Sequence, residues 1–271
     1  APTLPCPVLV VIPARYESSR YPGKPLVTLK GAGGVSKSLI QRTWEAATVV
    51  GGVDRVVVAT DDQRIKDASE SFGAEVVMTS SECRNGTERC AEAHDALGGG
   101  FDIIVNLQGD APLTPHWFVE SLIAGLSATK QAQVATPVLR CDGDGLNGLL
   151  EDRRAGRVGG TTAVFRQDKT ALYFSKEVIP YLDEKFEGSD PTPVFHHVGV
   201  YAYRPDALRS YPGWPIGPLE KLEGLEQLRF MESGRPVLCV EVEAKGRQFW
   251  ELNNPGDVEK IEKMMLEMGL D

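Results

Sequence analysis

The segment from Val8 to Leu26, V-L-V-V-I-P-A-R-Y-E-S-S-R-Y-P-G-K-P-L, constrains the fold more than any other part of the chain. It begins with an apolar, mostly β-branched run that is typical of a buried central strand. This run breaks at Pro13 into a polar loop with small residues. Arg15, Arg20 and Lys24 put three cations on that loop, just past the carboxyl end of a strand, where open α/β sheets bind their ligands.

The cationic loop predicts an anion site. It matches neither G-x-x-x-x-G-K-[ST] nor G-x-G-x-x-G, so the two common phosphate loops do not apply. Two arginines and a lysine can neutralise a triphosphate and stabilise the charge that builds on a departing pyrophosphate. The alternative is a solvated basic turn in an acidic protein.

Composition narrows the class of protein. The 271 residues carry a formal net charge of −9, which argues against a nucleic-acid or anionic-membrane surface. No apolar run approaches the ~20 residues of a membrane span, and the A-P-T-L-P-C-P start does not resemble a secretory signal. The five cysteines are widely spaced, with no C-x-x-C pair and no zinc-type spacing to the histidines. We therefore expect reduced thiols and a cytoplasmic protein.

Helix and strand patterns alternate through the first 110 residues. Apolar spacing predicts helices over 38–50, 63–72 and 87–97, and strands over 55–60, 75–78 and 102–107. Such alternation favours a doubly wound, mostly parallel sheet, and hence an α/β fold.

From about residue 133 the pattern changes to short strands between longer polar loops. We expect one domain over 1–271, with a mixed α/β extension over 133–248. The segment 140–160 is rich in glycine and charge and shows no clear periodicity. A helix is predicted over 255–268, with an asparagine able to cap it.

Asp110 is the strongest single candidate for chemistry. It follows the apolar strand over 102–107, in Gln108-Gly109-Asp110, where a carboxylate is placed for a ligand or metal. Mg²⁺ is usually held by one or two carboxylates together with substrate phosphate oxygens and water. The alternative is an aspartate that only shapes the turn.

Three further motifs carry candidate residues. R-N-G-T-E-R at 84–89 opens a helix whose backbone N–H groups, with Arg89, can meet a base or phosphate. H-V-G-V-Y-A-Y-R at 197–204 reads as a strand with His197, Gly199, Tyr201 and Tyr203 on one face. In P-L-E-K-L-E-G-L-E-Q-L-R at 218–229, leucines at helical spacing predict a core-facing stripe.

These motifs, with A-L-Y-F-S-K at 171–176, resemble the 3-deoxy-manno-octulosonate cytidylyltransferases, the CMP-Kdo synthetases. The family's patterns are P-A-R-x-x-S-x-R-x-P-G-K-P-L, S-G-T-E-R, Q-G-D-E-P, A-L-Y-F-S-R, H-x-G-x-Y-x-Y-R and P-L-E-x-x-E-x-L-E-Q-L-R. The resemblance spans nearly the whole chain. It implies a nucleotide-diphospho-sugar transferase-like fold, a reaction of CTP with a 2-keto-3-deoxy sugar acid, Mg²⁺, a homodimer and a place in lipopolysaccharide biosynthesis.

The resemblance also implies roles for individual residues. Arg15, Lys24 and Asp110 are the expected catalytic residues, and Asp110 and Asn253 the expected metal ligands. The expected nucleotide-binding residues are Pro13, Ala14, Arg15, Ser18, Arg20, Lys24, Asn85, Gly86, Thr87, Arg89 and Gln108. The expected sugar-acid-binding residues are Tyr173, Ser175, His197, Gly199, Tyr201, Glu226 and Gln227.

One departure from the family concerns the metal. The family's V-D-T-P-E-D supplies a second metal-binding aspartate, where this chain has Leu252-Asn253-Asn254-Pro255-Gly256-Asp257. Asn253 offers only a neutral carbonyl oxygen, which leaves Asp110 as the principal charged ligand. We expect Glu251 to point away from the position of Asn253. The open alternatives are a different ulosonate or phosphonate acceptor, and an inactive CTP-binding homologue.

Overall fold

The computed structural model describes residues 6–248 and 250–271, and the chain divides into two compact units. The first unit runs to Glu120 and also contains Arg204–Pro212 and Ala244–Asp271. The second contains Ser121–Tyr203 and Gly213–Glu243, which include most of the segment predicted as a mixed α/β extension.

The first unit alternates strands and helices. Its elements are β1 (Val8–Ala14), the 3-10 helix η1 (Lys24–Leu26), β2 (Thr28–Lys30), β3 (Ser36–Ser38), α1 (Leu39–Thr48), β4 (Arg55–Thr60), α2 (Gln63–Ser71), β5 (Glu75–Met78), α3 (Gly86–Ala96), β6 (Ile103–Leu107), α6 (Pro205–Ser210) and α9 (Asp257–Met268). Two of the four boundaries between the units fall within α4 (His116–Ala128) and the 3-10 helix η2 (Tyr211–Gly213).

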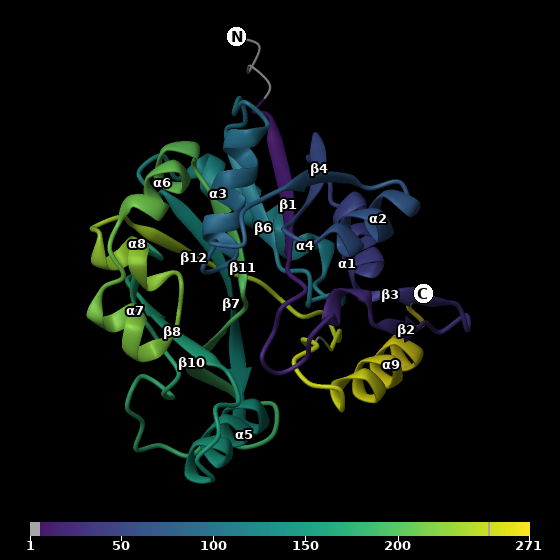
Figure 1. The fold of residues 1–271 in the computed structure, drawn as a ribbon. Helices are drawn as coiled ribbons and strands as arrows, with labels where there is room; N and C mark the ends of the chain where they lie inside the picture. The colour runs from purple at the N-terminus through teal and green to yellow at the C-terminus, as the bar shows by residue number, and fades with distance from the viewer. Residues whose placement is uncertain (1–5, 249) are drawn as a thin grey trace. The chain divides into compact units, whose positions relative to one another are not determined.

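The sheet of the first unit confirms the predicted parallel topology (Figure 1). Its strands follow the order β5-β4-β1-β6, and every neighbouring pair is parallel. All seven residues of β1 are buried, as expected for a strand with a neighbour on each side. Parallel pairing sets the carboxyl ends of β1 and β6 beside each other, so the loops that follow them meet at one edge.

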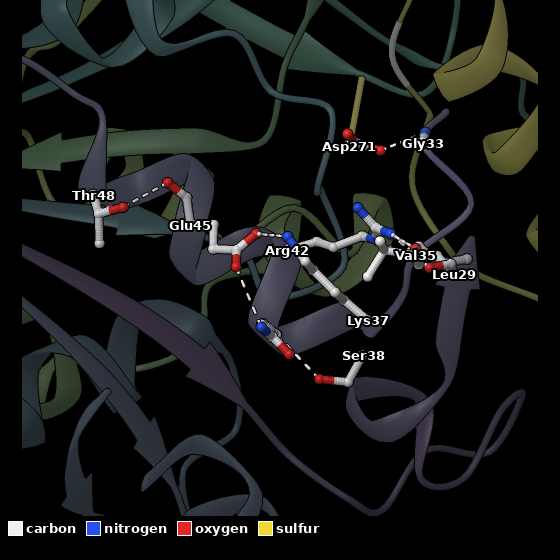
Figure 2. A network of polar contacts seen from close by, with 10 residues as sticks. Leu29, Gly33, Val35, Lys37, Ser38, Arg42, Glu45, Thr48 and Asp271 are labelled. Atoms are coloured by element: carbon white, nitrogen blue, oxygen red, sulfur yellow. Dashed lines mark hydrogen bonds and ion pairs between the residues drawn. The ribbon is translucent and has the colours of Figure 1, made fainter. Parts of the chain in front are cut away.

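A small antiparallel hairpin, β2 with β3, supports the base of the loop that follows β1. Figure 2 shows Arg42 of α1 reaching this hairpin, where its guanidinium donates to the carbonyls of Leu29 (2.8 Å) and Val35 (2.8 Å). Asp271 accepts a hydrogen bond from the Gly33 N–H, so the end of the described chain lies on the same hairpin. Arg42 is buried, and these carbonyls accept from its Nε and Nη2, whereas its Nη1 has no hydrogen-bond partner in the described structure.

The second unit is built on a mixed sheet. Its elements are β7 (Val134–Asp142), α5 (Gly143–Arg154), β8 (Thr161–Phe165), β9 (Ala171–Ser175), β10 (Pro191–His197), β11 (Val200–Tyr203), α7 (Pro218–Glu223), α8 (Leu228–Glu232) and β12 (Val237–Glu241). Strands β11-β7-β10-β8-β9 pair antiparallel in that order, and β12 pairs parallel to β7.

The segment 140–160, which showed no periodicity, contains a twelve-residue helix, α5. Asp142 caps it by accepting from the Gly145 N–H at 2.8 Å. Three glycines in its first half lower its intrinsic helix propensity and obscure the apolar spacing. Leu146 nonetheless packs with Cys141 and Val194, and this tertiary contact favours the helix.

Three local predictions are wrong. Leu219 and Leu222 are 40% and 83% exposed, because α7 ends at Gly224 (φ 65°), so no continuous helix turns the leucine stripe toward the core. His197 ends β10 and Tyr201 lies in β11, so the two do not alternate along one strand. No asparagine caps α9, whose N-cap residue is Gly256.

Within the described ranges, no helix combines the length and the apolar character that a membrane crossing requires.

Candidate active site

The turn after β6 contacts the carboxyl end of β1 in the first unit. The Gly109 N–H donates to the Pro13 carbonyl at 3.3 Å. Gly86, the first residue of α3, approaches the same place, since a Cβ there would lie 3.1 Å from Nε2 of Gln108. The structure therefore brings together the three segments in which the nucleotide-binding residues were predicted.

Helix α1 fixes the turn that carries Asp110. The Thr43 hydroxyl lies 3.2 Å from the carbonyl of Gly109 and 3.1 Å from that of Leu39 in its own helix. Thr43 is fully buried, so water does not compete with its hydrogen bond to the Gly109 carbonyl. Sequence analysis missed Thr43, because nothing in a helical pattern marks a hydroxyl that faces a distant turn.

Lys24 and Asp110 form an ion pair, with Nζ 2.9 Å from Oδ2. Lys24 opens η1, directly after Gly23, whose φ of 70° is a left-handed conformation that favours glycine. The Gly23 N–H closes the loop on the Tyr16 carbonyl at 2.8 Å. This closure holds Lys24 over Asp110.

The other loop cations remain outside this pair. Arg15 and Arg20 are both exposed, and Ser18 accepts from the Tyr21 N–H at 3.4 Å. The loop also packs on α2, where the Arg64 guanidinium lies 3.3 Å from the centre of the Tyr16 ring. The predicted anion loop thus combines a fixed lysine with two arginines that are open to solvent.

The start of α3 is organised by Asn85, the residue that replaces the family's serine. Its Oδ1 caps the helix by accepting from the Glu88 N–H at 2.9 Å, and its Nδ2 donates to the Tyr211 hydroxyl at 3.0 Å. Arg89 is buried and donates to Thr79 Oγ1 at 2.6 Å, so its guanidinium also links α3 to the segment after β5. Thr87 is buried in the same turn.

The segment around Leu252 brings a second carboxylate to Asp110. The Leu252 N–H donates to the Asp110 carbonyl at 3.0 Å. The charge of Asp110 and the side chain of Asn253 both act on the Glu251 carboxylate, so the expectation that Glu251 points away from this place is wrong. Residues two apart in the chain share a side when the residue between them, here Leu252, packs into the core.

Glu251 is solvent-accessible but lies in a crowded, acidic setting. Desolvation by surrounding protein atoms and then the charge of Asp110 raise its pKa to about 7. Lys24, the Asn253 hydrogen bond and Arg20 act in the opposite direction. Two carboxylates that oppose each other in this way are stabilised by an added cation.

The donor chemistry at this place fits Mg²⁺. Asp110 and Glu251 offer carboxylate oxygens and Asn253 an amide oxygen, which are the ligand types this ion prefers. Across residues 6–248 and 250–271, no three His, Cys, Asp or Glu side chains form a complete metal cage.

Two of the predicted sugar-acid residues, Tyr173 and Ser175, converge on Glu223, which sequence analysis missed. Its carboxylate accepts from the Tyr173 hydroxyl (3.1 Å), the Ser175 hydroxyl (2.7 Å) and the Lys176 N–H (2.9 Å). Glu223 ends α7, and the three donors belong to β9 and the residue after it. The motif at 218–229 contained this residue, but helical spacing alone gave no reason to single it out.

Gln227 has a buried donor without a partner. Its Oε1 accepts from the Tyr201 hydroxyl at 2.9 Å, whereas Nε2 is enclosed and has no hydrogen-bond partner in the described structure. The residue is only 1% exposed, and an unmet donor at such a place costs about 1–3 kcal/mol. This amide is therefore a candidate contact for an oxygen-rich substrate.

His197 is neutral at physiological pH. Burial lowers its pKa to about 3, with a smaller contribution from His196. Its Nε2 lies 2.7 Å from the Thr136 hydroxyl, and its ring packs on Phe174 and Tyr201 with centroids 5.0 and 5.8 Å away. Any contact of His197 with an acidic substrate is thus a hydrogen bond rather than an ion pair.

An ion pair stabilises the segment that carries Glu223, Glu226 and Gln227. Arg229 donates twice to Glu220, with both distances 2.8 Å and side chains only 1% and 9% exposed. The pair joins α7 to α8 across this segment. The predicted residue Gly199 lies in the short connection between β10 and β11.

Comparisons with known proteins agree with this arrangement. The family model described as "Cytidylyltransferase" matches residues 9–241. A 3-deoxy-manno-octulosonate cytidylyltransferase of Maricaulis maris is 43% identical over 97% of this chain and 98% of its own length. The mitochondrial 3-deoxy-manno-octulosonate cytidylyltransferase of Arabidopsis thaliana is 38% identical over 97% of this chain and 84% of its own length.

A solved structure of CMP:2-keto-3-deoxy-manno-octonic acid synthetase complexed with CTP superimposes with a TM-score of 0.82. It is 34% identical in sequence and covers 97% of this chain and 99% of its own. Fold and sequence together define an α/β nucleotidyltransferase. The chain belongs to the cytidylyltransferase family.

Proposed function

We propose that this chain couples CTP to 3-deoxy-manno-octulosonate (Kdo), giving CMP-Kdo and pyrophosphate. The observation that carries the proposal is the likeness, over 97% of the chain, to a synthetase solved with CTP. The Maricaulis maris 3-deoxy-manno-octulosonate cytidylyltransferase is matched over 98% of its length, which supports the transfer of the whole reaction. The meeting of the cationic loop, Gln108 and α3 supplies a place for the nucleotide.

In the proposed reaction, the anomeric hydroxyl of the sugar acid attacks the α-phosphorus of CTP. A bond forms between that oxygen and phosphorus, the bond to the β-phosphate oxygen breaks, and the hydroxyl proton passes to solvent. Arg15, Arg20 and Lys24 stabilise the charge of the triphosphate and of the leaving pyrophosphate. Most of the remaining rate enhancement comes from holding the two substrates in the reactive geometry, because the reaction needs no covalent intermediate with the protein.

We further propose that Mg²⁺ binds at Asp110. When bound, the ion would polarise the α-phosphate and offset its charge. Lys24 has two functions in this scheme, because it neutralises Asp110 before binding and can turn to the phosphates afterwards. The proposed sugar-acid contacts are Tyr173, Ser175, His197, Gly199, Tyr201, Glu226 and Gln227, with the unmet Nε2 of Gln227 as the most direct support.

The proposal is tested by measuring pyrophosphate release with CTP, Mg²⁺ and a panel of acceptors. Kdo should give the highest kcat/KM, and omission of the acceptor should abolish release. A higher kcat/KM with another ulosonate or a phosphonate would transfer the assignment to that acceptor. If the protein binds CTP but releases no pyrophosphate with any acid, the inactive-homologue alternative holds.

A homodimer and a cytoplasmic location are also part of the proposal. Leu219 and Leu222, three residues apart in α7, are 40% and 83% exposed and are candidates for the dimer interface. Sedimentation equilibrium at micromolar concentration tests the dimer.

A further inference from the structure

Helix α9 packs on the first unit through one apolar face and lies beside β2 (Figure 1). The face is made of residues at three- and four-residue spacing, Val258, Ile261, Met265 and Met268. They pack in one cluster with Leu29 of β2, Leu113 and Leu252. The helix therefore shares its core with segments that adjoin the Lys24–Asp110 pair.

The same cluster reaches both partners of that pair. Tyr21 and Val27 flank Lys24 and pack against the cluster. The Val27 N–H also donates to the Lys24 carbonyl at 3.1 Å. On the other side, the Leu252 N–H donates to the Asp110 carbonyl at 3.0 Å. The position of Lys24 relative to Asp110 thus depends on a core to which α9 contributes.

The first residue of α9, Asp257, holds the segment that precedes the helix. Its Oδ2 accepts from the N–H groups of Asn253 (3.0 Å) and Asn254 (2.7 Å). Its Oδ1 accepts from Nε1 of Trp250 at 3.0 Å. Hydrogen bonds to a charged acceptor are stronger than those between neutral groups, so the carboxylate fixes the backbone that donates to it. Asp257 therefore fixes the short segment that contacts the turn of Asp110.

The other end of α9 is bonded to the β2–β3 hairpin. Three acceptors take backbone N–H groups of the hairpin: Glu262 Oε1 from Lys30 (2.8 Å), the Leu270 carbonyl from Ala32 (2.8 Å) and Asp271 Oδ1 from Gly33 (Figure 2). The hairpin comes directly after η1, the 3-10 helix that begins with Lys24. These bonds therefore anchor the cationic loop at its carboxyl end.

We propose that α9 positions both partners of the Lys24–Asp110 pair, and that Asp257, Glu262 and Asp271 are the positioning residues. Asp257 holds the segment at Asp110, whereas Glu262 and Asp271 hold the hairpin that follows Lys24. The three carboxylates act through backbone N–H groups, and none was among the expected site residues. The inference rests on the proposed function, because it takes this ion pair as the centre of nucleotide transfer.

Steady-state kinetics of folded variants separate positioning from a purely structural role. Asp257→Ala, and Glu262→Ala combined with Asp271→Ala, should each lower kcat about tenfold or more, since small displacements of positioned groups are costly. KM for Kdo should change less than about twofold, because the expected sugar-acid residues lie in the second unit. Asp257→Asn should regain most of the lost rate, because its amide oxygen can still accept from the Asn253 N–H.

Hydrogen exchange measured by mass spectrometry is a second readout, and it needs no turnover. Amides in 15–27 should exchange at least about threefold faster in the double variant, and those in 108–114 in Asp257→Ala, because segments that lose anchoring bonds open more often. Exchange in 143–154, which form α5 of the second unit, should not change.

Glu259→Ala is the matched control. Glu259 is exposed in the first turn of α9, and within 6–248 and 250–271 it has no hydrogen bond or ion pair. The variant removes the same charge from the same helix, so its kcat and its exchange should equal those of the unmodified chain.

The inference is overturned if Asp257→Ala and the double variant keep kcat within about twofold of Glu259→Ala, or if exchange in 15–27 and 108–114 is unchanged. If circular dichroism shows that Asp257→Ala is unfolded, the double variant decides, because the two bonds it removes are exposed. Failure of the proposed function is a separate result: the unmodified chain would release no pyrophosphate from CTP and Kdo, whatever the exchange of the variants.

Discussion

Nζ of Lys24 lies 2.9 Å from Oδ2 of Asp110, a pair that joins the loop after β1 to the turn after β6. The two side chains are 17% and 26% exposed, so water can reach both. A partly exposed ion pair of this kind contributes little to folding stability. In the proposed reaction, the pair holds the Lys24 ammonium and the Asp110 carboxylate where the triphosphate and its metal would bind.

Lys24→Ala should lower kcat at least ~100-fold, the scale of losing one preorganised charge contact in a transition state. The variant should bind Mn²⁺ at least as tightly as the unmodified chain, because the Lys24 ammonium no longer competes for the Asp110 carboxylate. Steady-state kinetics with saturating CTP and Mn²⁺ titrations check the two parts. Lys30→Ala, on the exposed face of β2, is the control and should leave kcat within about twofold of the unmodified enzyme. Near-normal turnover of Lys24→Ala would contradict the role of the loop.

Asp110→Asn should abolish turnover and leave the fold intact. The carboxylate lies on a turn, and its ion pair with Lys24 is partly hydrated, so the free energy of unfolding should change by less than about 1 kcal/mol. Differential scanning calorimetry and pyrophosphate release measure the two effects. A large drop in the melting temperature would identify Asp110 as a structural residue, and surviving activity would move the metal site elsewhere.

Gln227→Glu should raise KM for the sugar acid at least ~10-fold and leave KM for CTP unchanged. The substitution keeps an oxygen to accept from Tyr201 but replaces the unpaired Nε2 donor with a carboxylate oxygen. An acidic acceptor would then meet a repulsive charge instead of a donor. Tyr201→Phe is the companion variant, because it removes the anchor of Gln227 and keeps the amide. Equal effects on both substrates would count against a sugar-acid contact.

The parallel sheet was predictable because its central strands, β1 and β6, are buried along their whole length. Val8–Ala14 reads as a continuous apolar run and Ile103–Leu107 as one interrupted only by Asn106, and helix patterns lie between the strands. Where tertiary contacts decide the structure, prediction failed. Helix α5 depends on the packing of Leu146 despite three glycines, and the break at Gly224 ends a leucine pattern that otherwise reads as one helix.

The site was predictable only where a strand end fixed its position. Asp110 follows β6 directly, so its place at the sheet edge needs no further information. Glu251 required knowledge that Leu252 packs into a core formed by residues far away in sequence. Glu223 could not be recognised either, because its three donors lie about 50 residues earlier in the chain, on β9 and just after it.

The final prediction concerns pH and His197. Its pKa is about 3 in the folded chain and near 6.5 when unfolded, so the unfolded state binds a proton first as the pH falls. The stability associated with the neutral ring is fully present above pH 6.5 and is lost progressively between pH 6.5 and 3. At pH 5 we expect this residue to lower the free energy of unfolding by about 2 kcal/mol relative to pH 8.

His197→Gln isolates this contribution, because glutamine can still bond to Thr136 but does not ionise. Urea unfolding at pH 8 and pH 5 gives the change in free energy for each protein. The unmodified chain should lose about 2 kcal/mol more than the variant, and the C2 proton of His197 should show no titration above pH 5 by nuclear magnetic resonance. Titration of that proton near pH 6.5 would mean that the ring is hydrated, and an ion pair with an acidic substrate would then become available to it.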